Sequence, residues 1–428
     1  MSFISLCNDF STLSILYFYF QIGNYKSLVF GNLMIFDTME ASNNTTAFQP
    51  CITLSQIHFY VDFSWWLSGV GTILISTLGM IFNAMAIYIL CDKRMCSSFF
   101  NRLLVCLAII DNLFLANAIF VVVVEKLIES PSADHLFIFV NFLYPTRNMF
   151  MCCSIYMTVG LACERFNSTS NPFLHRTRQN ESTCRRLLLY VLPVITFSVV
   201  YNIPKFFDLK ILERPLDFED SSNCSQSRLN DTSQSQCEIT TEFYTEPTNI
   251  RNNEAYILWY INVSNLIVTS VIPLLLLTYF NYKIYTALKE RQKRKANMVS
   301  QPNNTSGRKE HSKKENRQTF VLFAIVVLFV ICHALRVILN IAEFLEKYNV
   351  KQQGCTGKSF WTIVSIPIAA CLLQLNSGTN FFVYCVLSDL FREVLRSKLP
   401  LKRPFSNQNG FNAQIQTTQT HIELRQID

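Results

Sequence analysis

Charged residues are scarce in this 428-residue sequence: they make up 16% of it, whereas hydrophobic residues make up 50%. The apolar residues gather in long stretches instead of recurring at the spacing of an amphipathic helix. A soluble domain of this length would spread more charge over its surface elements. The scarcity of charge and the long apolar stretches therefore indicate a membrane protein.

Three further absences exclude other classes of protein. No lysine occurs between residues 359 and 397, so the last apolar stretch cannot form the Schiff base that a retinal protein needs. Internal repeats and broken stretches lined with charge are also missing, which argues against a transporter or a channel. The apolar stretches hold no cluster of nucleophile, base and orienting group, so we expect neither enzymatic activity nor a nucleic-acid partner.

The apolar stretches are seven in number, and each is close to the ~20 residues that an α-helix needs to cross a bilayer. They predict an all-α fold, a seven-transmembrane helix bundle. An amphipathic segment at 389–398 is expected to form a short eighth helix that holds the membrane surface through Leu390, Phe391, Val394 and Leu395. The expected spans are 65–90, 101–124, 136–163, 186–205, 255–282, 319–344 and 360–386.

The charge of the loops predicts the orientation of the spans. Basic residues gather in the first, third and fifth connections, most densely between residues 289 and 317, whereas loop 206–254 carries ten acidic residues and four basic ones. Because cytoplasmic loops carry an excess of Lys and Arg, we expect a plasma-membrane protein with its N-terminus outside and its C-terminus inside. All the tryptophans fit this orientation, since each is expected to open a span at the outer interface: Trp65, Trp66, Trp259 and Trp361.

The expected spans divide the chain into three parts. Residues 1–64 form an extracellular segment, residues 65–398 the bundle with its eighth helix, and residues 399–428 a cytoplasmic tail. Sequons of the form Asn-x-Ser/Thr on the outer side predict glycosylation at Asn43, Asn44, Asn223 and Asn230.

Most of the 15 cysteines lie within spans or at their inner ends, where Cys behaves as a small buried apolar residue. Cys51, Cys224, Cys237 and Cys355 lie outside and allow three disulfide pairings, which remain open from the sequence. The pair of Cys224 with Cys237 is the least demanding, because it closes a short loop.

Polar side chains inside the spans are candidates for function. Asp111 lies in the middle of the second span, where a carboxylate must be protonated, paired or metal-bound. Asn83 and Ser154 have two interpretations, a functional site or hydrogen bonds between helices of roughly 0.5–1.5 kcal/mol each. Glu164 and Arg165 form a charge pair at the inner end of the third span, which is costly unless function retains it.

Five local patterns stand out within and beside the spans: Gly79 with Asn83, 107–111 (LAIID), Glu164-Arg165-Phe166, Pro273, and 380–384 (NFFVY) before the amphipathic segment. In these positions and this order they resemble the patterns of rhodopsin-like (class A) G protein-coupled receptors, and the resemblance covers residues 65–398. The sixth span reads Cys332-His333-Ala334-Leu335-Arg336, and the seventh has Asn-Phe-x-x-Tyr in place of Asn-Pro-x-x-Tyr. These two features are similar to invertebrate FMRFamide-type neuropeptide receptors.

The resemblance implies an outer ligand and activation of a heterotrimeric G protein inside. It assigns coupling and activation to Glu164, Arg165, Asn380 and Tyr384, with Arg165 contacting Glu164 or the sixth span at rest. It also implies that a receptor kinase and arrestin act on the polar tail, and that membrane lipids contact the basic inner loops.

The same resemblance implies an allosteric sodium ion and no other cofactor. Asp111, Ser154, Asn376 and Asn380 occupy the positions where the family holds this ion, and each offers the oxygen ligand that a hard cation prefers.

Two positions depart from the family pattern. The cysteine that usually pins the second outer loop would stand 25 residues before Arg165, where this chain has Val140, and no Cys occurs from Leu107 to Met151. The sixth span also lacks the usual proline, which removes one cause of a kink. These departures affect the expected loop geometry and activation hinge, and they leave the expected fold unchanged.

The ligand is expected between the outer ends of the third, fifth, sixth and seventh spans. Arg147 lies on the face of Arg165, 18 residues and five helical turns before it, and it either contacts the ligand or pairs with Glu343. Together with Arg336 and Asn340 it forms the candidate ligand site. The acidic outer loop favours a cationic ligand, so we expect a short amidated peptide with Arg near its C-terminus.

One alternative keeps the same fold. A receptor for an anionic lipid or another small molecule would satisfy the cation at Arg147 directly. A transporter is a less favoured alternative.

Overall fold

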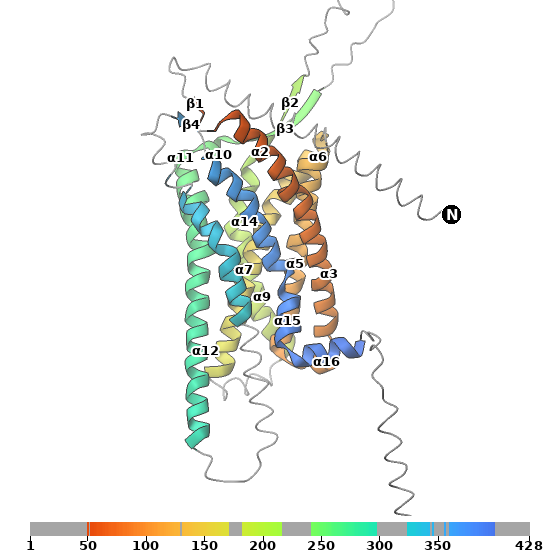
Figure 1. Cartoon of the computed structure of the whole chain (residues 1–428), viewed down its shortest axis with the longest axis vertical. Helices are drawn as coiled ribbons and strands as arrows, with labels where there is room; N and C mark the ends of the chain where they lie inside the picture. The colour runs from red at the N-terminus through yellow and green to blue at the C-terminus, as the bar shows by residue number, and fades with distance from the viewer. Residues whose placement is uncertain are drawn as a thin grey trace, which may run out of the picture.

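The computed structural model shows a bundle of long, roughly parallel helices, crossed at its inner end by the short helix α16 (Figure 1). Outside the bundle lie two small sheets of two strands each. The structure describes residues 49–50, 52–128, 131–170, 182–215, 241–297, 323–342, 345, 355–356 and 359–398.

The described residues contain seven helices that are long and apolar enough to cross a membrane, which confirms the predicted all-α bundle. Spans one to three are Leu54–Leu90 (α2 Leu54–Ser64, η1 Trp65–Gly71, α3 Thr72–Leu90), Phe99–Leu127 (α5 Phe99–Val122, η2 Val123–Leu127) and Ala133–Ser170 (α6 Ala133–Ile138, η3 Phe139–Leu143, α7 Tyr144–Ser170). Spans four and five are Thr183–Phe207 (α9 Thr183–Asn202, η4 Ile203–Phe207) and Glu254–Ala287 (α11 Glu254–Tyr256, η6 Ile257–Ser264, η7 Ile267–Val271, and α12, which begins at Ile272 and ends at Asn297). Span six is Phe323–Ala342, and span seven is Phe360–Gly378 (α14), after which α15 (Asn380–Leu387) follows.

Polar residues in the loops define where several spans begin. Ser182 accepts a hydrogen bond from the backbone N–H of Arg185 at the start of α9, and Ser359 accepts one from Thr362 at the start of α14. Asn253 caps α11 by accepting from the N–H of Ala255 at 2.9 Å. Such side chains satisfy N–H groups that have no partner within the helix.

Five segments of the spans are π-helical, and all of them lie in the outer halves of spans one, two, three and five. A π-helix bonds residue i to residue i+5, so each segment contains more residues per turn than the α-helix around it. Such segments are rare in proteins and are frequent at functional sites. The five are η1, η2, η3, η6 and η7.

The first membrane-length helix begins at Leu54, 11 residues before the expected start at Trp65. Trp65 does not open the span: it is 1% exposed inside a continuous helix, whereas Trp66 is exposed. The earlier turns escaped notice because His58 and Asp62 interrupt the apolar run. The side chain of Gln56 accepts a hydrogen bond from the Thr53 N–H at 2.9 Å, which supports the true start.

The second outer loop contributes an antiparallel hairpin of β2 (Leu209–Pro215) and β3 (Thr241–Pro247), in which Leu209 pairs with Pro247. Strand β1 (Gln49–Pro50) lies parallel to β4 (Cys355–Thr356). Both sheets lie at the same end of the bundle (Figure 1), which is the end that the loop charges predict to face outward.

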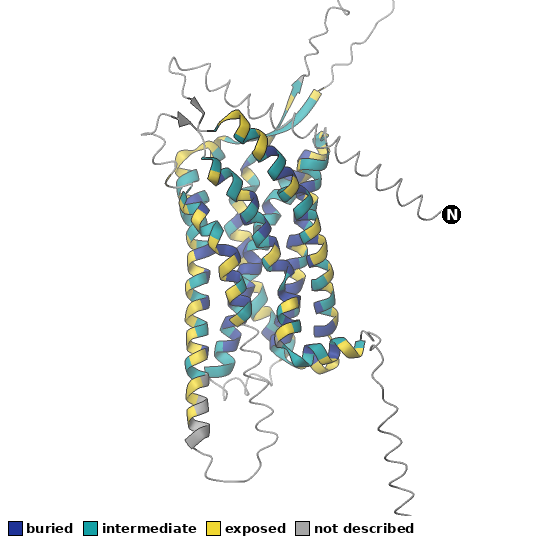
Figure 2. Cartoon of the chain, viewed as in Figure 1, coloured by how far each residue is buried: buried dark blue, intermediate teal, exposed yellow. Residues whose placement is uncertain are grey.

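Burial is concentrated where the helices face one another, and the outward faces are exposed (Figure 2). Many of the exposed side chains on the spans are apolar. Leu107, Leu161 and Leu277 are at most 1% exposed in the main core, whereas Leu189 and Leu275 are more than 60% exposed. Exposure of these leucine side chains to water would be unfavourable, whereas exposure to lipid tails is not. The chain is a multi-pass membrane protein.

Helix α16 (Asp389–Lys398) docks against the bundle. Lys398 lies 3.2 Å from Asp92, whose pKa is held below its ordinary value by the backbone N–H of Arg94 and by the Lys398 ammonium. Phe391 and Val394 are at most 1% exposed, so they pack inside the protein instead of holding the membrane surface as expected. Whether this helix also lies along lipid stays a prediction.

The first and seventh spans touch through two glycines. A Cβ on Gly79 would lie 2.8 Å from a side-chain carbon of Leu115 and 2.9 Å from the Cα of Gly378. Nearby, the amide of Asn83 donates to the backbone carbonyl of Ser377 at 3.0 Å. Only residues without a side chain allow this backbone contact.

We predict that Gly79→Ala lowers the apparent melting temperature of the purified chain in detergent, because the backbone of Gly378 cannot give way. The cost is about 1–3 kcal/mol, as for other overpacked cores. Gly160→Ala is the matched control, since a Cβ there meets nothing within 4 Å. It is expected to leave the melting temperature equal or slightly raised, and equal losses in the two variants would contradict the close contact.

Candidate functional site

A buried carboxylate joins three spans at mid-depth. Asp111 of α5 is 0% exposed. Its Oδ1 accepts a hydrogen bond from Ser154 Oγ of α7 at 2.6 Å, and its Oδ2 accepts one from Asn380 Nδ2 at 2.9 Å. Asn380 begins α15, just after the seventh span breaks at Thr379. The structure therefore brings together three of the four residues expected to bind sodium.

The fourth residue, Asn376, is half-buried one turn before Asn380, and no hydrogen bond within the described residues joins it to Asp111. Other polar atoms near the axis of the bundle are buried without a hydrogen-bond partner in the described part of the chain, among them Ser76 Oγ and Asn83 Oδ1. A buried carboxylate that meets only neutral donors can take up a proton or a cation.

At the inner end of the third span, Glu164 pairs with the fourth span. Its carboxylate lies 3.4 Å from Arg186 Nη2 and accepts a hydrogen bond from Tyr190 Oη at 2.7 Å. The side chains of Glu164 and Arg186 are 4% and 9% exposed. Arg186 also lies over the ring of Phe99, 4.2 Å from its centroid, so the ion pair is enclosed by aromatic side chains.

Arg165, next to that ion pair, lies over an aromatic ring. Its guanidinium carbon is 3.5 Å from the centroid of Phe100, which belongs to the first turn of α5. A cation over a ring face at this distance is attracted by the ring quadrupole. Tyr384, the other residue expected to act in coupling, is 2% exposed and packs against Phe391 of α16, with ring centroids 5.7 Å apart.

The outer ends of spans two and three hold charges of both signs. Glu125 in η2 is exposed, and its carboxylate interacts electrostatically with Arg147 of α7 and with Lys126. Lys126 donates to the backbone oxygen and the hydroxyl of Ser64, each at 3.0 Å. Glu125 is thus an acid whose charge Arg147 feels. The expected partner Glu343 lies outside the described residues.

The remaining candidate ligand residues are on the sixth span. Arg336 reaches the sulfur of Met151, which lies one turn inward of Arg147 on α7. Asn340 is one turn further out, half-buried, and its Nδ2 has no hydrogen-bond partner among the described residues. Two cations from facing spans and a free amide donor therefore lie in the outer third of the bundle.

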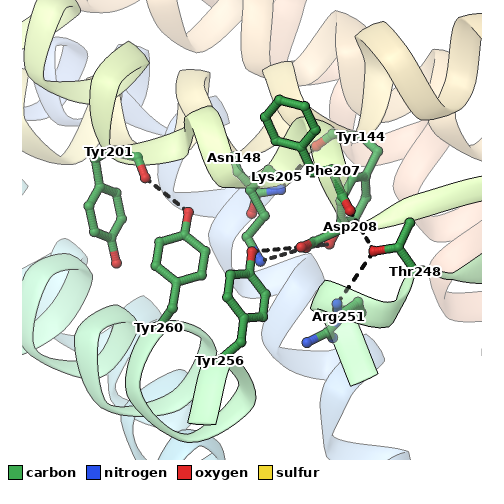
Figure 3. Close-up of polar contacts among 10 residues, drawn as sticks. All are labelled: Tyr144, Asn148, Tyr201, Lys205, Phe207, Asp208, Thr248, Arg251, Tyr256 and Tyr260. Carbon is green, nitrogen blue, oxygen red and sulfur yellow. Dashed lines mark hydrogen bonds and ion pairs between the residues drawn. The ribbon is translucent and has the colours of Figure 1, made fainter. Parts of the chain in front are cut away.

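A second buried carboxylate, Asp208, lies between the end of the fourth span and the hairpin (Figure 3). It is 0% exposed. Its Oδ2 accepts a hydrogen bond from Tyr144 Oη at 2.9 Å and lies 3.1 Å from Lys205 Nζ, and its Oδ1 accepts a hydrogen bond from Tyr256 Oη at 2.7 Å. Figure 3 shows these side chains converging on the carboxylate from the third, fourth and fifth spans.

Sequence reasoning missed Arg186, Glu125 and Asp208. In the sequence, Arg186 is one of the basic residues that mark a cytoplasmic connection, and Asp208 is one of ten acidic residues in its loop. The signal for Glu125 was present, because an acid and Lys126 at the outer end of an apolar run are costly unless they are paired.

Several predicted residues lie outside the described residues. They are the sequon residues Asn43, Asn44, Asn223 and Asn230, and the cysteines Cys224 and Cys237. Glycosylation and this disulfide stay predictions.

Seven membrane-length helices, a polar cluster at mid-depth, charges at the outer ends and a buried ion pair at the inner end define a seven-transmembrane receptor. A family model described as "Serpentine type 7TM GPCR chemoreceptor Srw" matches residues 71–402. The chain belongs to this family of G protein-coupled receptors, so it is a receptor and not an enzyme.

Similar proteins agree with the predicted subgroup. The FMRFamide receptor of Drosophila melanogaster is 26% identical over 356 residues, which cover 81% of this chain and 55% of that receptor. The FMRFamide peptide receptor frpr-18 of Caenorhabditis elegans is 20% identical over 77% of this chain and 68% of its own length. The probable G-protein coupled receptor frpr-1 of the same organism is 23% identical, with 82% and 84% covered. The resemblance to FMRFamide-type receptors is confirmed, although the chain spans about half the length of the Drosophila receptor.

We predict that Arg186→Met lowers the melting temperature strongly, because it removes the cation from a buried carboxylate. Breaking such a pair costs roughly 3–5 kcal/mol. Tyr190→Phe removes one hydrogen bond to Glu164 and is expected to cost less, about 1–3 kcal/mol.

Arg94→Met is the control for this prediction. It breaks the ion pair of Arg94 with Glu393, whose side chains are 63% and 67% exposed. Exposed pairs contribute roughly 0–1 kcal/mol. A loss at Arg186 no greater than at Arg94 would show that the buried pair does not stabilise the inner end of the bundle.

Proposed function

We propose that this receptor binds a short amidated neuropeptide on the outer side and activates a heterotrimeric G protein on the inner side. The observation that carries the proposal is the similarity to two receptors named for FMRFamide peptides, over 81% and 77% of the chain. The N-terminus is extracellular and the C-terminus cytoplasmic, in the plasma membrane, as the basic inner loops favour.

The ligand site lies between the outer ends of the spans. Arg147 and Arg336 present guanidinium groups, which suit the backbone carbonyls of an extended peptide and its terminal amide oxygen. Asn340 adds an amide donor without a partner among the described residues. Exposed Glu125, together with Glu343, supplies the negative charge that an arginine of the peptide needs.

The two arginines also support the alternative ligand class. An anionic lipid or another anionic small molecule would place its charge between Arg147 and Arg336, where a guanidinium binds a carboxylate or phosphate through two hydrogen bonds. The peptide is favoured because Glu125 beside Arg147 offsets the positive charge at this end of the site.

Coupling is proposed to use the inner ends of the third and seventh spans. The Glu164 carboxylate is paired with Arg186 of the fourth span, and the Arg165 guanidinium lies over the face of Phe100. A cation–ring contact is weaker than a buried ion pair, so losing the contact with Phe100 costs less than separating Glu164 from Arg186. Arg165 then turns to the G protein, while Asn380 and Tyr384 change their packing in the broken seventh span. Receptor kinase, arrestin and membrane lipids remain expected inner partners by resemblance.

An allosteric sodium ion is proposed at Asp111. The residues fit a hard cation, because a buried carboxylate and the Ser154 hydroxyl supply oxygen atoms, and the Asn380 amide, which donates its N–H to Asp111, would supply a third after it turns. The bound ion would neutralise Asp111 and favour the inactive arrangement. Asn376 would join them only after its side chain turns toward Asp111.

A panel of synthetic amidated peptides, with Phe-Met-Arg-Phe-amide as the first member, is expected to raise calcium or change cAMP in cells that express the receptor. The same peptide with a free C-terminal carboxylate is the matched control, since a negative charge replaces the neutral amide and its N–H donors. Silence across the peptides while anionic lipids activate the receptor, or displace a bound probe, would establish the alternative.

Sodium chloride is expected to weaken binding of the active peptide relative to choline chloride at equal ionic strength. Asp111→Asn removes the charge with little change in volume and is expected to abolish this difference. Measurement of peptide affinity in the two salts tests the site directly. An Asp111→Asn receptor that keeps the sodium response would refute it.

A further inference from the structure

Asp208 joins four elements at the outer end of the bundle. The hydroxyls of Tyr144 and Tyr256 and the ammonium of Lys205 converge on its two carboxylate oxygens from spans three, five and four (Figure 3). The fourth element is the hairpin, because β2 begins at Leu209, the next residue.

The backbone around Asp208 strengthens this junction. The N–H of Thr248 donates to the Asp208 carbonyl at 3.0 Å, and Thr248 Oγ1 donates to the carbonyl of Phe207 at 2.6 Å. Thr248 follows β3 directly, so both ends of the hairpin are fixed at one point. The hairpin therefore cannot shift without breaking contacts of Asp208.

No covalent bond of the usual kind ties the third span to this loop. The outer half of the third span has no cysteine, and Val140 stands where the tether was expected. Val140 instead lies in an apolar cluster with Phe139 and Val121, against which Leu209 and Ile211 of the hairpin pack. Apolar contact is not directional, so it can hold the hairpin down without fixing its angle.

Directional contacts come from Asp208 and the tyrosines below it. Tyr256 packs against Tyr260 with ring centroids 5.0 Å apart, and Tyr260 Oη donates to the backbone carbonyl of Tyr201 at 2.9 Å. These contacts join the fourth and fifth spans beneath Asp208. A buried carboxylate loses its hydration, so it needs all of its donors at once, and that need links the elements cooperatively.

We propose that Asp208 is the noncovalent tether of the second outer loop and thereby a positioning residue for ligand binding. Its carboxylate fixes the outer ends of spans three, four and five around the site of Arg147 and Arg336. Asp208 does not touch the ligand itself, because it is 0% exposed and both oxygens already accept hydrogen bonds. The effect on ligand binding rests on the proposed peptide function, whereas the tether does not.

Asp208→Asn tests the proposal with little change in volume. An amide has one acceptor oxygen, so its NH₂ group would face a donor of Tyr144, Lys205 or Tyr256. We expect the apparent melting temperature of the full chain in detergent to fall by about 5 °C or more. At matched surface expression, the concentration of Phe-Met-Arg-Phe-amide for half-maximal response is expected to rise at least about tenfold, with the maximal response unchanged.

Tyr256→Phe and Tyr260→Phe form a matched pair on the same helix. Tyr256→Phe removes a donor from Asp208 and is expected to shift half-maximal response in the same direction as Asp208→Asn, and by less. Its effect on the melting temperature should vanish in the Asp208→Asn background, because the two changes break one network. Tyr260→Phe removes the bond to Tyr201 and no donor of Asp208, so its effect on the melting temperature should add to that of Asp208→Asn, and it should shift half-maximal response by less than Tyr256→Phe does.

A covalent tether should replace the lost one. In the Asp208→Asn receptor, Val140→Cys with Ile211→Cys is designed to form a disulfide within the apolar cluster. This disulfide is expected to restore the melting temperature and the half-maximal peptide concentration to their wild-type values, and a reductant should reverse both effects. A verified crosslink that leaves the response weak would overturn the tether.

Other outcomes also decide the question. Asp208→Asn with an unchanged melting temperature and a lost response would make Asp208 a ligand contact, and no change in either would remove its role. If the wild-type receptor gives no response to the peptide, the proposed function is wrong. The melting temperatures of the single and double variants still test the tether in that case.

Discussion

A lipid environment offers no water to polar groups, and this constraint organises the molecule. Buried carboxylates inside the spans meet partners on neighbouring helices: Asp111 joins spans two, three and seven, and Glu164 joins spans three and four. Burial of apolar surface alone does not favour one helix contact over another in lipid, because the lipid tails are as apolar as the side chains. Close packing, as between Gly79 and Gly378, and polar contacts between helices therefore specify which helices are neighbours.

The buried polar groups differ in their partners. Glu164 is enclosed with a cation, and Arg165 beside it lies over the face of a ring. Asp111 accepts hydrogen bonds from two neutral donors. At the outer end, Asp208 is buried with two hydroxyl donors and the Lys205 ammonium, whereas the Asn340 amide has a donor without a partner among the described residues.

The sequence was sufficient for the features that depend on local composition. Apolar length located seven spans, and the resemblance to the receptor family grouped Asp111, Ser154 and Asn380, which the structure places in contact. It failed where a partner is chosen by tertiary contact. No local sequence pattern identifies Arg186 as the partner of Glu164. Asp208 differs from the nine other acidic residues of its loop only in its contacts with tyrosines of distant helices. The helical turns from Leu54 to Ser64 were not predicted, because His58 and Asp62 interrupt the apolar run.

The π-helical segments have a consequence for comparisons with relatives. One such turn amounts to a single residue inserted into an α-helix, which rotates everything beyond it by about 100°. Counting from Arg165 stays in phase through the regular helix to Arg147 and loses phase at η3, where Val140 lies. Equivalent positions in a relative can therefore be counted from the inner motifs only as far as the π-helical segment of each span. Beyond that segment, the outer positions need an alignment of their own. Insertions of one residue can re-aim the ligand-facing side chains there without disturbing the machinery below.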